Sequence, residues 1–149
     1  MLLKDFYTTE ALHCGRNTTV LEAAELMHRR HIGDLIVVDD LDDNPIPVGL
    51  VTDRDIVLKV LGNGRDAAKT RVADIMSMPL VTAADEEDSS AAIARMRSHG
   101  VRRLPVTTAG GRLVGIVTLD DLLRMLRTEV DGLLDILTRE QDQERRGRR

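Results

Sequence analysis

The sequence predicts an α/β (α+β) fold made of two β-α-β-β-α repeats with pseudo-twofold symmetry, followed by a C-terminal helix. Two observations carry this prediction. Residues 3–60 recur with substitutions at 72–126, and both copies end on the motif Gly-apolar-Val-Thr-x-x-Asp. Within each copy the hydrophobic period changes in the same order, from a short strand to a helix, then to two strands and a second helix.

The register of the two copies follows from matching residues. An offset of 69 residues pairs Asp5 with Asp74 and Met27 with Met96. Beyond Val37 the offset falls to 66, because the first copy is three residues longer between its two central strands. The extra residues fall in the predicted hairpin turn at 39–45, where changes of length are tolerated and where Asp42 and Asp43 add acidic charge.

Each element has its own local signal. Thr19 with Glu22 resembles a capping box that opens a helix, and the acidic run 85–88 suits the start of its counterpart. Short apolar runs predict leading strands at 11–13 and 80–82, and central strands at 35–38, 48–51, 104–106 and 113–117. Apolar residues at 56–61 and 122–126 predict the second helix of each copy.

These elements divide the chain into repeat 1 at 1–61, a linker at 62–71, repeat 2 at 72–127 and a C-terminal segment at 128–149. Each half alone is too short to bury a sizeable core, so we expect the halves to share one. The C-terminal segment carries a stripe of Val130, Leu133, Leu134 and Leu137, which predicts an amphipathic helix before a charged tail from Gln141 that should fray. The stripe packs on its own pair, across a dimer or on a separate partner.

Composition excludes several classes of function. A net charge of -4 and an aromatic content of 1% argue against nucleic-acid binding, and the tail arginines Arg145, Arg146, Arg148 and Arg149 are expected to be solvated. The N-terminus meets charge within a few residues, which argues against a signal peptide or membrane span. Cys14 is the only cysteine, which fits a reducing cytoplasm.

The repeated Gly-x-x-Thr-x-x-Asp phrase, with Val101-Arg-Arg-Leu-Pro-Val106 before the preceding turn, resembles the cystathionine-beta-synthase (CBS) domain in its tandem, or Bateman, arrangement. The resemblance covers roughly residues 3–127, although the first copy lacks the proline of Leu104-Pro105-Val106. Because no catalytic domain is attached, the chain resembles a stand-alone bacterial CBS-pair protein, similar to the hypoxic-response type. It implies a cleft for up to two adenosine-type ligands, dimerisation into a disc, and a sensor of energy state or metabolites.

The strand-to-helix junctions have chemistry of their own. Thr52 and Thr118 stand at the mouth of a helix, where free amide groups and the helix dipole favour an anion such as phosphate. Asp55 and Asp121, one turn on, offer acceptor oxygens for a ribose diol, and Gly49 and Gly115 leave the strand bare for a planar base. The competing interpretation is that Thr-x-x-Asp only caps a helix.

Cations distinguish the two predicted sites. Arg54 places a guanidinium beside Thr52, whereas Arg102 and Arg103 stand where the first copy has Gly33 and Asp34. We rank the site at Thr118 above the site at Thr52.

Other candidate residues favour structural roles. His13 and Cys14 are adjacent but point to opposite faces of a strand, which favours a surface or interdomain position. His28 and His31 lack a third metal ligand, and His99 ends a helix, where positive charge is favoured. No catalytic constellation is evident, so we expect a protein that is not an enzyme.

Two functional hypotheses remain. The first is a cytoplasmic regulatory module that binds AMP, ADP, ATP or a related adenosyl ligand, with no cofactor required, and that changes the geometry of a homodimer read by an unidentified regulated protein. Outer apolar residues such as Leu58 and Met125 support the homodimer. The second is an interaction scaffold with vestigial pockets.

Overall fold

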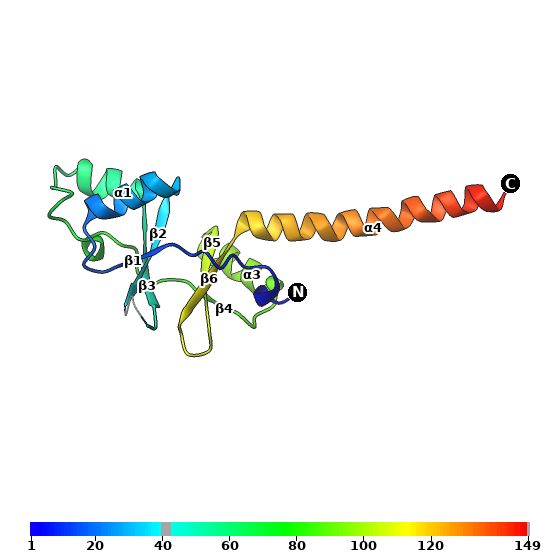
Figure 1. Cartoon of the computed structure of the whole chain (residues 1–149), viewed down its shortest axis with the longest axis horizontal. Coiled ribbons are helices and arrows are strands. Elements are labelled where there is room, and N and C mark those ends of the chain that lie inside the picture. The colour runs from blue at the N-terminus through cyan, green and yellow to red at the C-terminus, as the bar shows by residue number, and fades with distance from the viewer. Residues whose placement is uncertain (40–42, 149) are drawn as a thin grey trace.

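The computed structural model describes residues 1–39 and 43–148, so Asp42 and Arg149 lie outside the described residues. Two three-stranded sheets stand side by side, and one long helix extends away from them (Figure 1). In repeat 1 the elements are β1 (His13–Gly15), α1 (Val20–Arg30), β2 (Asp34–Asp39), β3 (Ile46–Thr52), α2 (Asp53–Asp55) and a π-helix, η2 (Ile56–Leu61). In repeat 2 they are β4 (Ala83–Ala84), α3 (Ser89–His99), β5 (Arg103–Thr107), β6 (Leu113–Thr118) and α4 (Leu119–Gly147). Short 3₁₀ turns, η1 (Leu3–Asp5) and η3 (Val72–Asp74), open the two repeats.

The two sheets share one topology. The first strand of each pairs in parallel with the second, which pairs antiparallel with the third, in the orders β1-β2-β3 and β4-β5-β6. Val37 lies opposite Gly49 and Val106 opposite Gly115, and each ladder shifts register at this point. This equivalence confirms the predicted fold class and repeat register.

Local caps place the first helix of each repeat. Thr19 accepts from the Glu22 amide at 3.1 Å while Glu22 accepts from the Thr19 amide at 2.9 Å, which confirms the predicted capping box. Asp88 caps α3 by accepting from the Ser90 amide. The two helices end in left-handed residues, His31 and Gly100.

Burial corrects the expectation of one shared core. Each repeat has its own apolar cluster, and a small third cluster of Ile36, Val38 and Leu113 lies between them. Each repeat completes its core with the first residues of the other repeat. Leu3 is fully buried with repeat 2, whereas Val72 and Ile75 are buried with repeat 1. In Figure 1 the N-terminal segment accordingly crosses from the first sheet to the second.

The leading strands lie later than predicted. They form at His13–Gly15 and Ala83–Ala84 instead of 11–13 and 80–82, because these are the residues that lie alongside β2 and β5. Ala11 and Leu80 of the predicted strands pack on the cluster between the repeats, whereas Leu12 and Val81 pack on the cores of repeats 1 and 2. Apolar runs alone do not show which of these two surfaces they cover.

Helix α4 differs most from prediction. It runs without a break from Leu119 to Gly147, so the predicted start of a new helix at Thr128 and the frayed tail are both wrong. The stripe residues Val130, Leu133, Leu134 and Leu137 are all more than half exposed, so they do not pack on their own pair. Met125, expected on an outer face, is buried, whereas Leu58 is exposed as predicted. Among the described residues, no helix is long and apolar enough to span a membrane.

Candidate functional site

The two Thr-x-x-Asp motifs form equivalent helix caps. Thr52 Oγ1 accepts from the Asp55 amide at 3.1 Å, and Asp55 Oδ2 accepts from the Thr52 amide at 3.0 Å. The corresponding distances at Thr118 and Asp121 are 3.2 and 2.9 Å. The capping interpretation therefore describes both motifs, and any ligand must bind alongside these caps.

The caps also satisfy most of the amides that were expected to bind phosphate. The Asp53 amide donates to the Gly33 carbonyl at 2.9 Å and the Arg54 amide to the Asp53 carboxylate at 2.8 Å. At the second junction the Leu119 amide donates to the Arg102 carbonyl. The helix mouths are thus poorer anion sites than the sequence suggested, because their donors already have partners.

Asp55 and Asp121 are turned into the caps and away from the clefts. Asp55 also pairs with Lys59 at 3.1 Å, and Asp121 lies 3.6 Å from Arg124. Neither carboxylate lines the two clefts described next. Both carboxylates thus have partners within the caps, and their contact with a ribose diol stays a prediction.

Two clefts of unequal size lie between the repeats. The larger has a volume of about 1000 Å³ and takes its walls from both repeats. Its apolar residues include Ile32, Leu50, Pro79, Leu80, Val81, Val101 and Pro105, and its polar residues include Asp34, Thr52, Asp53, Arg54, Arg102 and Arg103. The smaller, of about 250 Å³, lies at Thr118 and includes Glu10, Leu12, Ile36 and Ile116. The larger volume therefore favours the site at Thr52 over the site at Thr118, whereas the sequence suggested the opposite order.

An ion pair joins Arg103 to Asp34 at the boundary of the two clefts. Arg103 Nη1 contacts Asp34 Oδ1, and both residues line both clefts. They occupy equivalent positions of the two repeats, at the starts of β5 and β2. The Asp34 side chain is 16% exposed and the Arg103 side chain 38%, so the carboxylate is the more buried partner. Sequence reasoning placed Arg103 in the site and missed Asp34 and Asp53, although the repeat alignment already paired Asp34 with Arg103.

The space beside the two glycines of the motif is filled by other parts of the chain, so it is not open to the base of a ligand. A Cβ on Gly49 would lie 2.6 Å from Met76 Sδ, and one on Gly115 would overlap the Tyr7 ring. The Leu50 and Ser77 backbones exchange two hydrogen bonds here, as do those of Thr8 and Ile116. The strand faces that we expected to be bare at Gly49 and Gly115 are thus covered by residues 76–77 and 7–8.

The remaining candidate residues have structural surroundings. Cys14 is 5% exposed in the core of repeat 1, which corrects its predicted surface or interdomain position, and burial raises the pKa of its thiol to about 11. His13 Nδ1 lies 3.1 Å from the Ala11 carbonyl. His28 is exposed on α1 and His31 is its C-cap. No group of three or more metal-ligating side chains occurs within 1–39 and 43–148.

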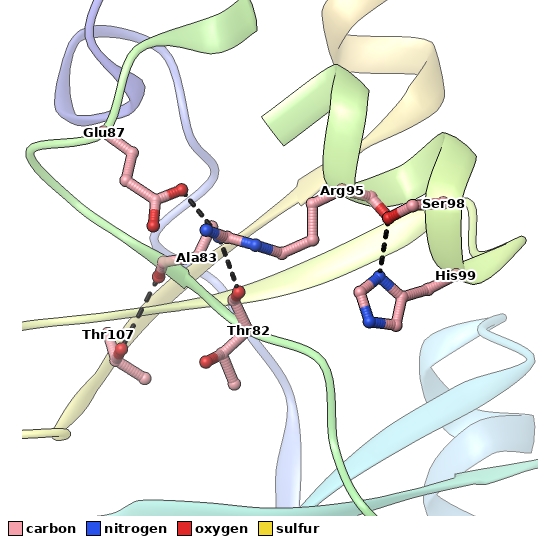
Figure 2. Close-up of polar contacts among 7 residues, drawn as sticks. All are labelled: Thr82, Ala83, Glu87, Arg95, Ser98, His99 and Thr107. Atoms are coloured by element: carbon pink, nitrogen blue, oxygen red, sulfur yellow. Dashed lines mark hydrogen bonds and ion pairs between the residues drawn. The ribbon is translucent and has the colours of Figure 1, made fainter. Parts of the chain in front are cut away.

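His99 and Arg95 fix the end and the flank of α3. Figure 2 shows His99 Nδ1 beside Ser98 Oγ, at 3.0 Å, and the same nitrogen lies 3.0 Å from the Arg95 carbonyl. Arg95 Nη1 donates to the Thr82 carbonyl at 2.9 Å and to Glu87 Oε2 at 2.6 Å (Figure 2). These bonds hold α3 against the segment that continues from Val81, a wall residue of the larger cleft.

Comparison with known proteins agrees with this architecture. The CBS domain family profile matches residues 3–62 and 72–128. The CBS domain-containing protein YhcV of Bacillus subtilis is 38% identical over 120 residues, which cover 80% of this chain and 81% of YhcV. The uncharacterized protein MK0525 of Methanopyrus kandleri is 36% identical over 107 residues, or 72% of this chain, and the matched region spans about half of its length, 53%.

Solved structures show the same fold. Hypoxic Response Protein I, which was solved with two coordinated zinc ions, superposes with a TM-score of 0.73 at 31% identity and covers 83% of this chain and 98% of its own. The CBS domain pair of protein MJ0100, in complex with 5′-methylthioadenosine and S-adenosyl-L-methionine, gives 0.72 at 27% identity, covering 87% and 98%. The chain thus belongs to the CBS domain family, whose paired domains are regulatory modules, and it carries one such pair.

Proposed function

We propose that this chain is a regulatory module that binds an adenosine-type ligand in the larger cleft, beside Thr52. The observation that carries the proposal is the composition of that cleft, in which apolar walls from both repeats meet three arginines at the repeat boundary. Its volume of about 1000 Å³ is at the upper end of the range for small-molecule sites. The two ligands of MJ0100, 5′-methylthioadenosine and S-adenosyl-L-methionine, are consistent with this class.

Each part of an adenosine ligand has a suitable partner in this cleft. Aliphatic side chains such as Ile32, Leu50 and Val101 offer an apolar slot for the base. Arg54 and Arg102 form no ion pair within the described part of the chain, so their guanidinium groups are available to a phosphate. Asp34 and Asp53 supply acceptor oxygens for ribose hydroxyls, in the role that we first gave to Asp55 and Asp121.

The position of the clefts between the two repeats suggests how ligand binding could change the shape of the protein. A ligand that contacts both repeats binds best to one arrangement of them and so shifts the protein toward it. Helix α4 begins directly after its N-cap, Thr118, which lines the smaller cleft, and continues unbroken to Gly147, so it carries such a shift away from the body. We propose that a cytoplasmic homodimer presents this change to a regulated protein.

A thermal-shift panel tests ligand binding. The panel contains AMP, ADP, ATP, S-adenosylmethionine and 5′-methylthioadenosine. At ~100 times its dissociation constant, a true ligand stabilises the fold by roughly 2.7 kcal/mol and raises Tm by about 2 to 8 °C. Arg102→Gln should reduce the shift for phosphorylated ligands more than for 5′-methylthioadenosine, which has no phosphate. If no compound moves Tm and calorimetry detects no heat, the vestigial scaffold is the better description.

A further inference from the structure

The two clefts differ in charge, although they lie at equivalent motifs. Among the described residues, the charged side chains that line the larger cleft are Arg54, Arg102, Arg103, Asp34 and Asp53. Those that line the smaller cleft are Arg103, Asp34 and Glu10. Three cations and two carboxylates give the larger cleft a net charge of +1, whereas one cation and two carboxylates give the smaller a net charge of -1. A cleft of positive charge concentrates anionic ligands.

Two sequence differences between the repeats produce this asymmetry. By the offset of 66 residues, Arg54 of repeat 1 corresponds to Asp120 of repeat 2. By the offset of 69 residues, Arg102 of repeat 2 corresponds to Gly33 of repeat 1. Each arginine lines the larger cleft, and neither counterpart supplies a cation to the smaller one. The extra positive charge of the larger cleft therefore comes from Arg54 and Arg102.

These two arginines approach the larger cleft from different repeats. Arg54 lies in α2, and Arg102 directly precedes β5. Both side chains are exposed and form no ion pair within residues 1–39 and 43–148, whereas Arg103 is paired with Asp34. A guanidinium group binds a phosphate through two parallel hydrogen bonds. Two such groups, held by separate elements, bind a chain of phosphates better than a single phosphate, because the chain offers each group a partner.

We infer that Arg54 and Arg102 make the larger cleft selective for adenosine ligands with a phosphate chain, such as ATP, over AMP and S-adenosylmethionine. This inference rests on the proposed function, because it takes the larger cleft as the ligand site. AMP has one phosphate to share between two guanidinium groups. S-adenosylmethionine has a positively charged sulfonium, which both arginines repel, so the same residues attract one ligand and reject the other. The volume of about 1000 Å³ leaves room for a phosphate chain beside the nucleoside.

Titration calorimetry of the full chain with ATP, AMP and S-adenosylmethionine tests this selectivity. In wild type the tighter binding step should favour ATP over AMP by about tenfold, the value of one added hydrogen-bonded contact between charged groups. S-adenosylmethionine should bind more weakly than AMP. Arg54→Gln and Arg102→Gln should each reduce the ratio of ATP to AMP affinity by about threefold, and the double variant should remove the preference, because the two groups contribute separately.

Arg29→Gln is the matched control. It removes the same charge from an exposed position on α1 that lines neither cleft, so it should keep the wild-type ratio. Equal affinity of wild type for ATP and AMP would overturn the inference and leave adenosine binding intact. An ATP preference that survives in the double variant, or that Arg29→Gln loses equally, would also overturn it.

Inorganic triphosphate separates a failure of this inference from a failure of the proposed function, because it has the phosphate chain and no nucleoside. Wild type should bind it, and the double variant should bind it at least about tenfold more weakly. If triphosphate binds in this way while no adenosine compound binds, the proposed function fails and the phosphate-chain site stands. If neither triphosphate nor any adenosine compound binds, both are overturned.

Discussion

Burial sets the chemistry of Cys14. Its thiol is packed among Val20, Leu35 and Val37 in the core of repeat 1, and desolvation raises its pKa to about 11. A raised folded-state pKa means that the neutral thiol favours the folded state. The stability that depends on it is complete below the ordinary thiol pKa and is lost as the pH rises toward about 11.

We therefore expect Tm to fall between about pH 9 and pH 11 by more in wild type than in Cys14→Ala. Scanning calorimetry of both proteins across this range measures the difference. Other groups that titrate near pH 10 affect the two proteins equally, so only the thiol contributes to the difference. Parallel curves for the two proteins would contradict the assigned role of burial.

The capping hydroxyl of Thr118 has a predictable energetic value. It accepts from the Asp121 amide at 3.2 Å and donates to Asp121 Oδ2 at 2.9 Å. Thr118→Ala should lower the free energy of unfolding by about 1 kcal/mol, because the Asp121 amide loses its acceptor. Denaturant melts measure this loss. Thr118→Ser keeps the hydroxyl and should retain most of the stability, whereas equal losses in both variants would assign the effect to the lost methyl group.

Residue-level prediction succeeded where the signal was local. Thr19 and Glu22, three residues apart, are enough to specify a capping box, and the structure contains it. The sequence did not predict the ion pair between Arg103 and Asp34, although the repeat alignment placed these residues at equivalent positions. Equivalent residues meet only if they lie near the pseudo-twofold axis, and the distance from that axis depends on how the whole repeats pack.

At the scale of elements, Gly132 and Gly100 both have open space where a side chain would lie. We nevertheless expect substitution by alanine to change the stability of the protein in opposite directions at the two positions. A Cβ at Gly132 or Gly100 would have no atom within 4 Å. Gly132 lies in the interior of α4, whereas Gly100 caps α3 with φ 64°. Gly132→Ala should therefore stabilise the protein by about 0.5–1 kcal/mol, because alanine is the better helix former. Gly100→Ala should destabilise it, since a Cβ is strained in the left-handed region.

Circular dichroism and denaturant melts of these two variants provide the comparison. Gly132→Ala should keep or raise helical content together with stability. If both substitutions shift stability in the same direction, backbone conformation does not control these positions.

The length of α4 shows what a repeat boundary does and does not predict. The second repeat ends near residue 127, and we placed a helix end there, but the sequence has neither a proline nor a C-capping glycine at that point. Gly132 alone did not stop the helix. Repeats mark evolutionary units, whereas helices end where capping or breaking residues stop them.

At the scale of the whole molecule, the repeat predicted the sheet order but not how the halves share their segments. Residues 3–7 complete the core of repeat 2 and residues 72–76 that of repeat 1. Nothing local to Leu3 shows which core it will enter, because both cores have equivalent surfaces. The same exchange covers Gly49 and Gly115, which is why the predicted base-binding face at these glycines is filled by backbone.

We propose that the ion pair between Arg103 and Asp34 couples the two clefts, because both side chains line both of them. An anionic ligand in either cleft competes with Asp34 for the Arg103 guanidinium. Arg103→Gln should therefore weaken AMP and ATP binding at both clefts. Arg102→Gln is the matched control, since Arg102 lines only the larger cleft.

We predict that the smaller cleft takes a second nucleotide, in line with the two ligands that a CBS pair is expected to hold, and titration calorimetry with AMP and with ATP should then resolve two binding steps. Wild type should show a second step weaker than the first, because the ligand that binds first has already engaged Arg103, and typical coupling of this kind is about 5- to 150-fold. In Arg103→Gln both dissociation constants should rise and the coupling should vanish, whereas in Arg102→Gln only the step at the larger cleft should weaken. Two independent steps in wild type, or an Arg103→Gln effect limited to one step, would show that the pair holds the repeats together without linking their ligands.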